Sequence, residues 1–297
     1  MANLKEVRDR IQSVKNTQQI TKAMKMVAAS KLRRAQDAIV QMRPYANKLN
    51  EMLRNILSNL EGGANTSFGE ERPVEKACVV VVTSSKGLCG AFNSNIIKQA
   101  IAIINGQYAD VRAKGNLTIL CVGKKGYEFF KKAPYADCQL IDDYVELFND
   151  LSFDNVSTVS KRLMQSFERG IFDSVTVAYG QFKNAAVQIP MADQFLPVAK
   201  LEKEEGASKH KADYIFEPNK EELLEHLVPS IIQTQFQKYV LDTHASEHGA
   251  RMTAMEAASE NAQELIGELQ LSYNKARQEA ITNEILEIVG GAAALGA

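Results

Sequence analysis

Residues 4–42 read LKEVRDRIQSVKNTQQITKAMKMVAASKLRRAQDAIVQM. Steps of alternately three and four residues through this stretch select mostly apolar side chains, which is the spacing of a coiled-coil seam. The twelve seam positions are Leu4, Val7, Ile11, Val14, Gln18, Thr21, Lys25, Ala28, Leu32, Ala35, Ile39 and Met42. Nine of the twelve are apolar, and no glycine or proline occurs before Pro44. The stretch therefore predicts a long helix that winds around a partner helix.

The middle of this seam is polar. It carries Gln18, Thr21 and Lys25, and the apolar side of the helix shifts there to another face. That second face comprises Ile20, Met24 and Val27. We expect it to need a partner of its own.

The C-terminal part of the chain has the same spacing, from Ala245 to Asn283, and its helical pattern begins at about Asn219. At about 1.5 Å per residue, residues 219–289 span roughly 100 Å and residues 3–58 roughly 80 Å. Residues 1–50 hold 11 Lys or Arg and 3 Asp or Glu, whereas residues 245–297 hold 3 and 8. Length and complementary charge predict that the two helices pair antiparallel.

The chain ends with EILEIVGGAAALGA, residues 284–297. Apolar residues surround the last turns of this helix on all sides: Ile281, Ile285, Leu286, Ile288 and Val289. A helix that is apolar all round is normally buried all round, and one partner helix covers only one side. We therefore expect other chains to enclose this end.

Short β-branched runs lie between the arms, at residues 76–84, 116–123 and 173–182. Helical stretches separate them, at about residues 93–105, 126–132 and 153–172. This alternation predicts a parallel sheet covered on both faces. The expected fold is α/β, with a long antiparallel coiled coil of the N- and C-terminal helices and one inserted Rossmann-like domain. The expected boundaries are 1–60 and 218–297 for the coiled-coil helices and 74–217 for the α/β domain. Within that domain we expect a solvated linker at 199–213 and a last short strand at 214–218.

Two motifs suggest chemistry. SSKGLCGAFNSNI (84–96) follows a strand and opens a helix, where nucleotide-binding folds hold phosphate, but its glycine spacing fits no phosphate-binding motif. A tight turn with Asn93 or Ser94 as helix cap is the favoured interpretation. HASEH (244–248) matches H-x-x-E-H, a zinc-protease pattern, yet a third ligand and a cleft are missing, so we interpret the match as chance.

The composition argues against several further classes of function. The net charge of −1 predicts no general attraction to nucleic acid, although the basic arm leaves a coiled-coil nucleic-acid binder as an alternative. The four cysteines have no CxxC spacing and are expected to be reduced and buried. No apolar run reaches the length of a membrane span, and we expect a bacterial protein without a leader peptide.

Four stretches resemble the gamma subunits of F-type ATP synthase: ITKAMKMVAASKLRRAQ (20–36), SSKGLCGAFNSNI (84–96), ASEHGARMTAMEAA (245–258) and LSYNKARQEAITNEILEIVGGAAAL (271–295). The resemblance runs through essentially the whole chain and is strongest in the two arms. It implies a rotor shaft in a ring of alpha and beta subunits, present as one copy per complex. It also implies a foot domain that contacts the epsilon subunit and the c-subunit ring at the cytoplasmic face of the bacterial membrane. Membrane contact would occur only through the c ring.

The same resemblance assigns partner contacts to Met24, Arg251, Gln278 and Thr282, and a weaker c-ring contact to Glu217. Arg251 and Gln278 lie off the seam spacing, so we expect them to matter for rotation and not for folding. The basic arm would face acidic loops of the beta subunits. The sequence predicts no catalytic residue, no metal and no cofactor, and the chemistry would belong to the partners. A nucleotide-binding α/β enzyme is the remaining alternative.

The apolar end of the last helix gives a first prediction. Removal of Gly290–Ala297 should raise the solubility of the isolated chain, because less apolar surface is left without its enclosing partner. Sedimentation of the full and truncated chains would measure this, with circular dichroism to check that the α/β domain stays folded. Greater aggregation of the truncated chain would contradict the idea of an enclosed helix end.

Overall fold

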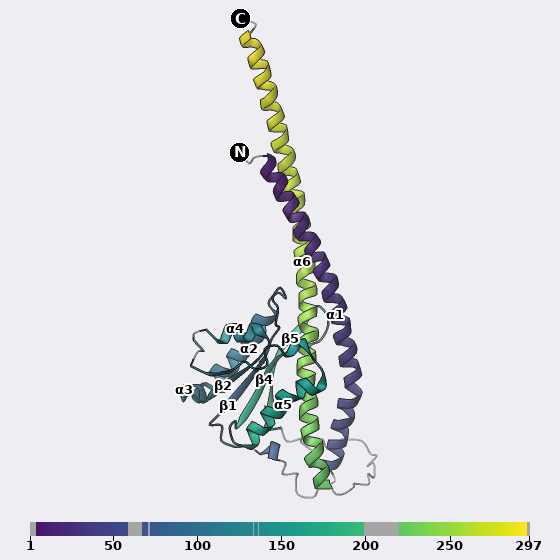
Figure 1. Cartoon of the computed structure of the whole chain (residues 1–297), viewed down its shortest axis with the longest axis vertical. Helices are drawn as coiled ribbons and strands as arrows, with labels where there is room; N and C mark the ends of the chain where they lie inside the picture. Colours follow the sequence, from purple (N-terminus) through teal and green to yellow (C-terminus); the bar gives the residue numbers. More distant parts are fainter. Residues whose placement is uncertain are drawn as a thin grey trace. The chain divides into compact units, whose positions relative to one another are not determined.

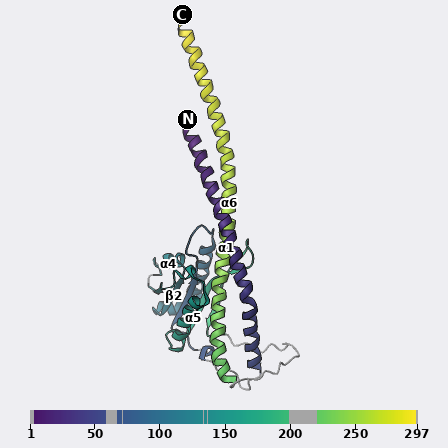
Figure 2. The same ribbon diagram turned by 45° about the vertical axis from the view of Figure 1, so that its right-hand side comes forward.

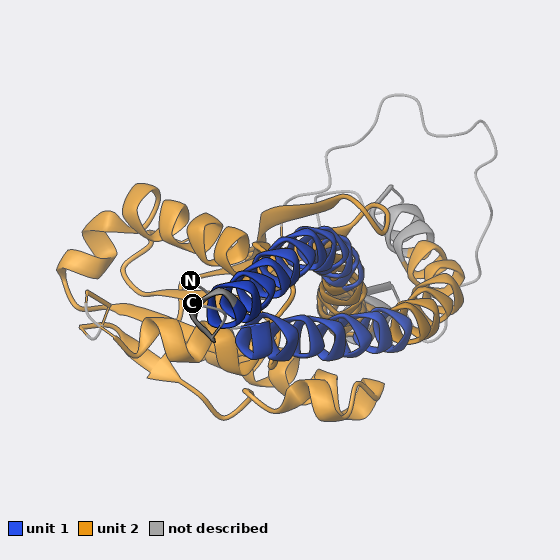
Figure 3. Cartoon of the chain, turned by 90° about the horizontal axis from the view of Figure 1, so that it is seen from above, with its two compact units in different colours: residues 1–28, 252–297 blue, residues 29–251 orange. Residues whose placement is uncertain are grey.

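The computed structural model describes residues 4–58, 67–70, 72–132, 134–135, 137–198 and 220–295. The chain divides into two compact units, residues 1–28 with 252–297 and residues 29–251 (Figure 3). Each unit contains part of both long helices, α1 (Leu4–Ser58) and α6 (Lys220–Leu295). Pro44 lies inside α1, and the helix continues past this proline. The apolar helical spacing resumes after it in the sequence, with Leu49, Met52, Leu53 and Ile56.

In the first unit, α1 and α6 run antiparallel, as expected from the sequence. Three polar contacts define the register. The Gln18 side-chain amide donates to Gln263 Oε1 at 2.9 Å, and the hydroxyls of Thr21 and Ser259 lie 2.7 Å apart. Lys25 Nζ lies 2.5 Å from Glu256 Oε1. Residue numbers thus rise along one helix as they fall along the other.

The polar interruption of the seam takes a different form from the expected one. Gln18 and Thr21 are themselves buried, each 9% exposed, because polar side chains of α6 face them. The seam therefore passes through this point with hydrogen bonds in place of apolar contacts. Ile20 and Val27 remain 60% and 57% exposed, and Met24 is half-buried. The second apolar face predicted from the sequence is present and lies open.

The register also fixes where the pairing ends. Facing residues have numbers that add to 280 or 281, which places Leu4 level with about Arg277. Within the described residues, α6 continues beyond that level as a single helix, and Figures 1 and 2 show its yellow end running past the start of α1. Residues 277–292 are exposed throughout.

The second unit is built on a sheet whose described strands have the order β3-β2-β1-β4-β5. These strands are β1 (Ala77–Val82), β2 (Leu117–Val122), β3 (Gln139–Ile141), β4 (Ser174–Phe182) and β5 (Gln188–Leu196). The pairs β1–β2, β1–β4 and β2–β3 are parallel, and β5 joins β4 antiparallel. Strands β1 and β2 are buried along their whole length, as expected for a sheet with two covered faces.

Helices cover both faces of the sheet. One face packs on α2 (Phe92–Gly106), α3 (Ala109–Ala113) and α4 (Lys124–Phe130). The other packs on α5 (Phe153–Glu168) and on α6, which contributes Val228, Ile232 and Phe236 to the core. The coiled-coil spacing did not predict that this part of α6 would pack on the sheet.

The sequence predictions for the strands are confirmed at β1, β2 and β4, and those for the helices at α2, α4 and α5. Strands β3 and β5 were not predicted, and the linker at 199–213 and the strand at 214–218 lie outside the described residues. All four cysteines are free and buried, as expected, and burial raises the pKa of Cys78 and of Cys121 to about 12. In the described part of the chain, no helix combines the length and the apolar character needed to cross a bilayer.

Close packing between β4 and α2 gives a stability prediction. A Cβ at Gly180 would lie 2.7 Å from Cε2 of Phe92, a buried ring. Gly180→Ala should therefore destabilise the chain by about 1–3 kcal/mol, the usual cost of overpacking a core. Gly106→Ala is the matched control, because no atom lies within 4 Å of its added methyl group. Urea unfolding would measure both, and equal midpoints for the two variants would contradict the packing argument.

Candidate functional site

The carboxyl ends of the parallel strands are the natural place to look for a ligand site. In doubly wound sheets, ligands bind where the strand order reverses, outside the carboxyl ends. Here that point lies between β1 and β4. It is bordered by the loop of residues 83–91, which follows β1, and by Gly180 near the end of β4.

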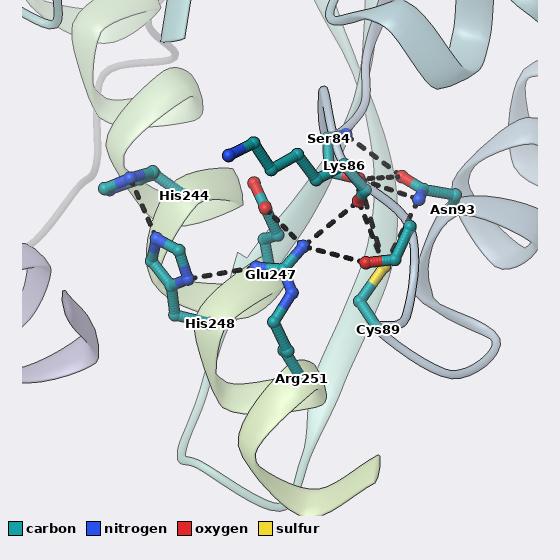
Figure 4. A network of polar contacts seen from close by, with 9 residues as sticks. Ser84, Lys86, Cys89, Asn93, His244, Glu247, His248 and Arg251 are labelled. Atoms are coloured by element: carbon teal, nitrogen blue, oxygen red, sulfur yellow. Dashed lines mark hydrogen bonds and ion pairs between the residues drawn. The ribbon is translucent and has the colours of Figure 1, made fainter. Parts of the chain in front are cut away.

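Helix α6 of the same chain occupies this position. Thr243 Oγ1 accepts a hydrogen bond from the Gly180 amide at 3.2 Å, and the Ser246 hydroxyl donates to the Gly180 carbonyl at 3.1 Å. The Arg251 guanidinium donates to the carbonyls of Lys86 and Gly87 at 3.0 and 3.2 Å (Figure 4). The crevice that holds a nucleotide in other doubly wound folds is thus filled by a helix.

The loop of residues 83–91 is organised from within. Leu88 and Gly90 have positive φ angles of 62° and 59°. The Asn93 side chain accepts from the Ser84 amide at 3.0 Å and donates to the Ser84 hydroxyl at 2.7 Å. The expectation that Asn93 or Ser94 caps α2 is wrong, because the cap position is Ala91 and makes no side-chain cap bond. Asn93 braces the loop instead.

The HASEH residues form a chain of polar contacts that ends at this loop. Glu247 lies 2.7 Å from Arg251, and Arg251 also contacts Nδ1 of His248 at 3.1 Å. Nε2 of His248 lies 3.1 Å from Nε2 of His244 (Figure 4). Glu247 thus forms an ion pair with an arginine of the next turn, and the two histidines are hydrogen-bonded to each other. In the part of the chain that the structure describes, no three His, Cys, Asp or Glu side chains are grouped as metal ligands.

Burial sets the protonation of these groups. Burial, reinforced by nearby Lys31 and Arg251, lowers the pKa of His244 to about 4. The pKa of His248 falls to about 3, mainly through burial and then through His244 and Arg251. Burial raises the pKa of Glu247, and the Arg251 charge opposes that rise. Both histidines are therefore neutral at pH 7.

The structure separates the residues that the resemblance assigns to partner contacts. Gln278 and Thr282 are exposed on α6, one turn apart, and the Thr282 hydroxyl donates to the Gln278 carbonyl at 2.9 Å. Met24 is half-buried on α1, beside the Lys25–Glu256 pair. Glu217 lies outside the described residues.

The structure corrects the expectation for Arg251. It is only 9% exposed, and its donors are used within the chain, so its position off the seam spacing does not make it a free surface residue. The expectation that it is irrelevant to folding does not fit these contacts. The sequence also gave no reason to single out Thr243, Ser246 or Gly180, because their partners are 63 to 66 residues away.

The bare end of α6 is the second candidate site. Five large apolar side chains there are between 47% and 65% exposed: Ile281, Ile285, Leu286, Ile288 and Val289. At 3.6 residues per turn they fall within roughly half of the helix circumference, and Asn283, Glu284 and Glu287 occupy the other side. The expectation that they surround the helix is therefore wrong, although they do form an exposed apolar face. Contiguous apolar surface of this kind marks a binding site for another protein.

Comparison with known proteins identifies the family. Residues 3–295 match the family model described as ATP synthase. The chain is 51% identical over 299 residues to the ATP synthase gamma chain of Cytophaga hutchinsonii, and 50% identical over 295 residues to that of Flavobacterium psychrophilum. Each alignment covers 99% of both chains.

Solved structures agree on the fold. A chain of the Euglena gracilis mitochondrial ATP synthase (OSCP/F1/c-ring) aligns with a TM-score of 0.70 at 24% identity, covering 98% of this chain and 94% of that chain. A chain of the central stalk/c-ring structure of Tetrahymena thermophila mitochondrial ATP synthase aligns with a TM-score of 0.55 at 24% identity, over 81% and 99%. The family model and the two bacterial relatives show that the protein is an ATP synthase subunit. Among these subunits, it belongs to the gamma-chain family.

The buried histidines predict how stability depends on pH. The unfolded chain binds protons at these sites near pH 6.5, but the folded chain binds them only near pH 4 and 3. The two histidines should therefore lower the free energy of unfolding as the pH falls below 6.5, by about 1–2 kcal/mol each between pH 7 and 5. Asp242, whose pKa is raised by burial to about 6, should offset part of this loss. Urea titrations at both pH values would measure this. His248→Gln should lose less stability than the original chain, and an equal loss in the two would contradict the assignment.

Proposed function

We propose that this chain is the central rotor shaft of an F-type ATP synthase. The observation that carries the proposal is the bare, apolar end of α6 in a chain of the gamma-chain family. An exposed helix end that carries five large apolar side chains requires a protein neighbour. A ring of alternating alpha and beta subunits provides a sleeve around such a helix, and a helix inside it can turn.

The role of the chain in the reaction is conformational. It is a non-catalytic subunit, and the nucleotide sites belong to the beta subunits. Each orientation of an asymmetric shaft presents different contacts to each beta subunit, so that identical sites are held in different states. Rotation of the c ring is thereby coupled to ATP synthesis, and ATP hydrolysis to rotation in the reverse direction.

The partner contacts follow from exposure and charge. Met24, Gln278 and Thr282 are at least partly exposed and remain proposed contacts with the alpha and beta subunits. The open face of Ile20 and Val27 supports a partner beside this part of α1. Exposed cations flank it, which suits an acidic protein surface.

The sheet domain, taken as residues 74–217 between coiled-coil helices 1–60 and 218–297, is the proposed foot. It would contact the epsilon subunit and the c ring, with Glu217 at the c ring. The chain would lie peripherally at the cytoplasmic face of the bacterial membrane, in one copy per complex, with membrane contact only through the c ring. Copurification of alpha and beta subunits with this chain is the direct test, and their absence would overturn the proposal.

The helix end also gives a sharper test. Ile285→Asp and Leu286→Asp replace side chains that are 54% and 62% exposed, so the isolated chain should keep its stability within about 0.5 kcal/mol. In the assembled complex the same carboxylates would be buried without a partner, and ATP hydrolysis should fall. Glu287→Gln, on the same turns, is the control and should leave hydrolysis unchanged. Normal turnover of the complex with both aspartates would contradict an enclosing sleeve.

A further inference from the structure

A hollow of about 450 Å³ lies within the second unit, between α1, α6 and the residues that lead into α5. Its walls are mostly apolar or aromatic, and they include Ala35, Met42, Tyr45, Leu151, Phe153 and Leu241. Tyr45 and Phe153 are 56% and 45% exposed, so both rings are available for contact with a ligand. A hollow of this volume and lining is typical of a small-molecule site when a few polar groups converge on it.

His244 is the first of these polar groups, and its neighbours fix its tautomer. Arg251 can only donate, so Nδ1 of His248 accepts and Nε2 of His248 carries the proton. That proton is donated to Nε2 of His244 (Figure 4). Because both rings are neutral at pH 7, Nδ1 of His244 carries the other proton. The described residues accept no hydrogen bond from this N–H, and His244 lines the hollow.

Gln237 is the second polar group. It lines the hollow and is only 7% exposed. Its side-chain nitrogen donates to the Leu151 carbonyl at 3.1 Å, a bond that a flip of the amide would lose. Its Oε1 is buried and has no hydrogen-bond partner among the described residues. A buried acceptor without a partner is destabilising, so a ligand donor is favoured there, once a small shift of a wall side chain uncovers the oxygen.

The charge of the hollow is positive, and it is concentrated at one end. Arg34 is exposed at the rim, and none of the described residues that line the hollow is acidic. Helix α1 lines it from Arg34 to Tyr45, and α6 lines it from Thr234 to His244. The two helices run in opposite directions (Figures 1 and 2), so Arg34 lies toward the His244 end and Tyr45 toward the Gln237 end. A cation and an N–H donor thus share one end, and an unpaired acceptor lies at the other.

We infer that this hollow binds a small aromatic carboxylate that carries a hydroxyl or N–H donor at the far end of its ring. The carboxylate accepts from Nδ1 of His244 and is attracted by Arg34, and the ring donor reaches Oε1 of Gln237. The ring itself packs against the apolar and aromatic walls. His244 and Gln237 are two helical turns apart, roughly 10 Å along α6, so the ligand is elongated. This inference does not depend on the rotor proposal.

Three probes separate the contributions of the two ends. The complete probe is para-hydroxyphenylacetate, phenylacetate lacks the ring donor, and para-hydroxyphenylethanol lacks the negative charge. Equilibrium dialysis with the full chain should give each incomplete probe an affinity roughly tenfold below that of the complete one. That factor is the usual effect of losing one hydrogen bond to a buried or charged group.

Substitutions assign each preference to its residue. Gln237→Leu should remove the preference for para-hydroxyphenylacetate over phenylacetate, because the acceptor of the ring donor is gone. Arg34→Gln should reduce the preference for the acid over the alcohol. Arg33→Gln is the matched control, because Arg33 is the exposed neighbour of Arg34 on α1 and does not line the hollow. Each comparison is made between two probes on the same variant, so a general loss of stability cannot imitate the result.

The contrary results are equally clear. Equal affinities of the three probes, or no saturable binding of the complete probe, would overturn the inference. Preferences that survive both Gln237→Leu and Arg34→Gln would place the probe elsewhere and overturn it as well. Loss of binding in the complex with alpha and beta subunits would show that another subunit covers the hollow, which excludes a site for a free small molecule. None of these results affects the rotor proposal, which copurification tests separately.

Discussion

The structure depends on one constraint: a helix satisfies its own backbone but cannot bury an apolar surface without a neighbour. Helix α6 has 76 residues and meets this constraint differently along its length. Residues around Phe236 pack on the sheet, and residues from Glu256 to Gln263 pair with α1. From about Gln278 onward, the described residues give the helix no neighbour, and its apolar residues are exposed. The last segment is as apolar as the others, so its neighbour must be another protein.

The polar seam contacts make the pairing specific. A continuous apolar seam of small and branched residues can slide by a heptad with little loss of buried area, whereas buried polar groups must find their own partners. Gln18 faces Gln263 and Thr21 faces Ser259, so a shift in register would leave both pairs buried and unpaired. These contacts add less stability than apolar packing would, but they fix how far α6 extends beyond α1. The length of the bare end is thus set in the middle of the coil.

The sequence predicted the features that depend on local pattern. The two long helices, their antiparallel pairing and strands β1, β2 and β4 follow from spacing and β-branched runs. Strand β5 was not predicted, because it contains Pro190 and Asp193 and has little continuous apolar character. Such a composition is typical of an edge strand. The contact of Arg251 with the loop of residues 83–91 could not be predicted for another reason. Its partners there are 164 and 165 residues away, and a coiled-coil pattern gives no information about contacts at such separations. Asn93 was predicted as a helix cap from its residue type alone. In the structure its side chain is instead hydrogen-bonded to the amide and the hydroxyl of Ser84.

The loop after β1 differs from a phosphate-binding loop in the groups that it presents. A phosphate-binding loop presents backbone N–H donors to an anion at a helix N-terminus. In this loop the Ser84 amide is taken by Asn93, while the carbonyls of Lys86 and Gly87 point to a cation, Arg251. The polarity of the site is thus reversed, and its ligand is part of the chain itself. A doubly wound sheet already offers a crevice at its strand ends, and here a long helix of the same chain occupies that crevice.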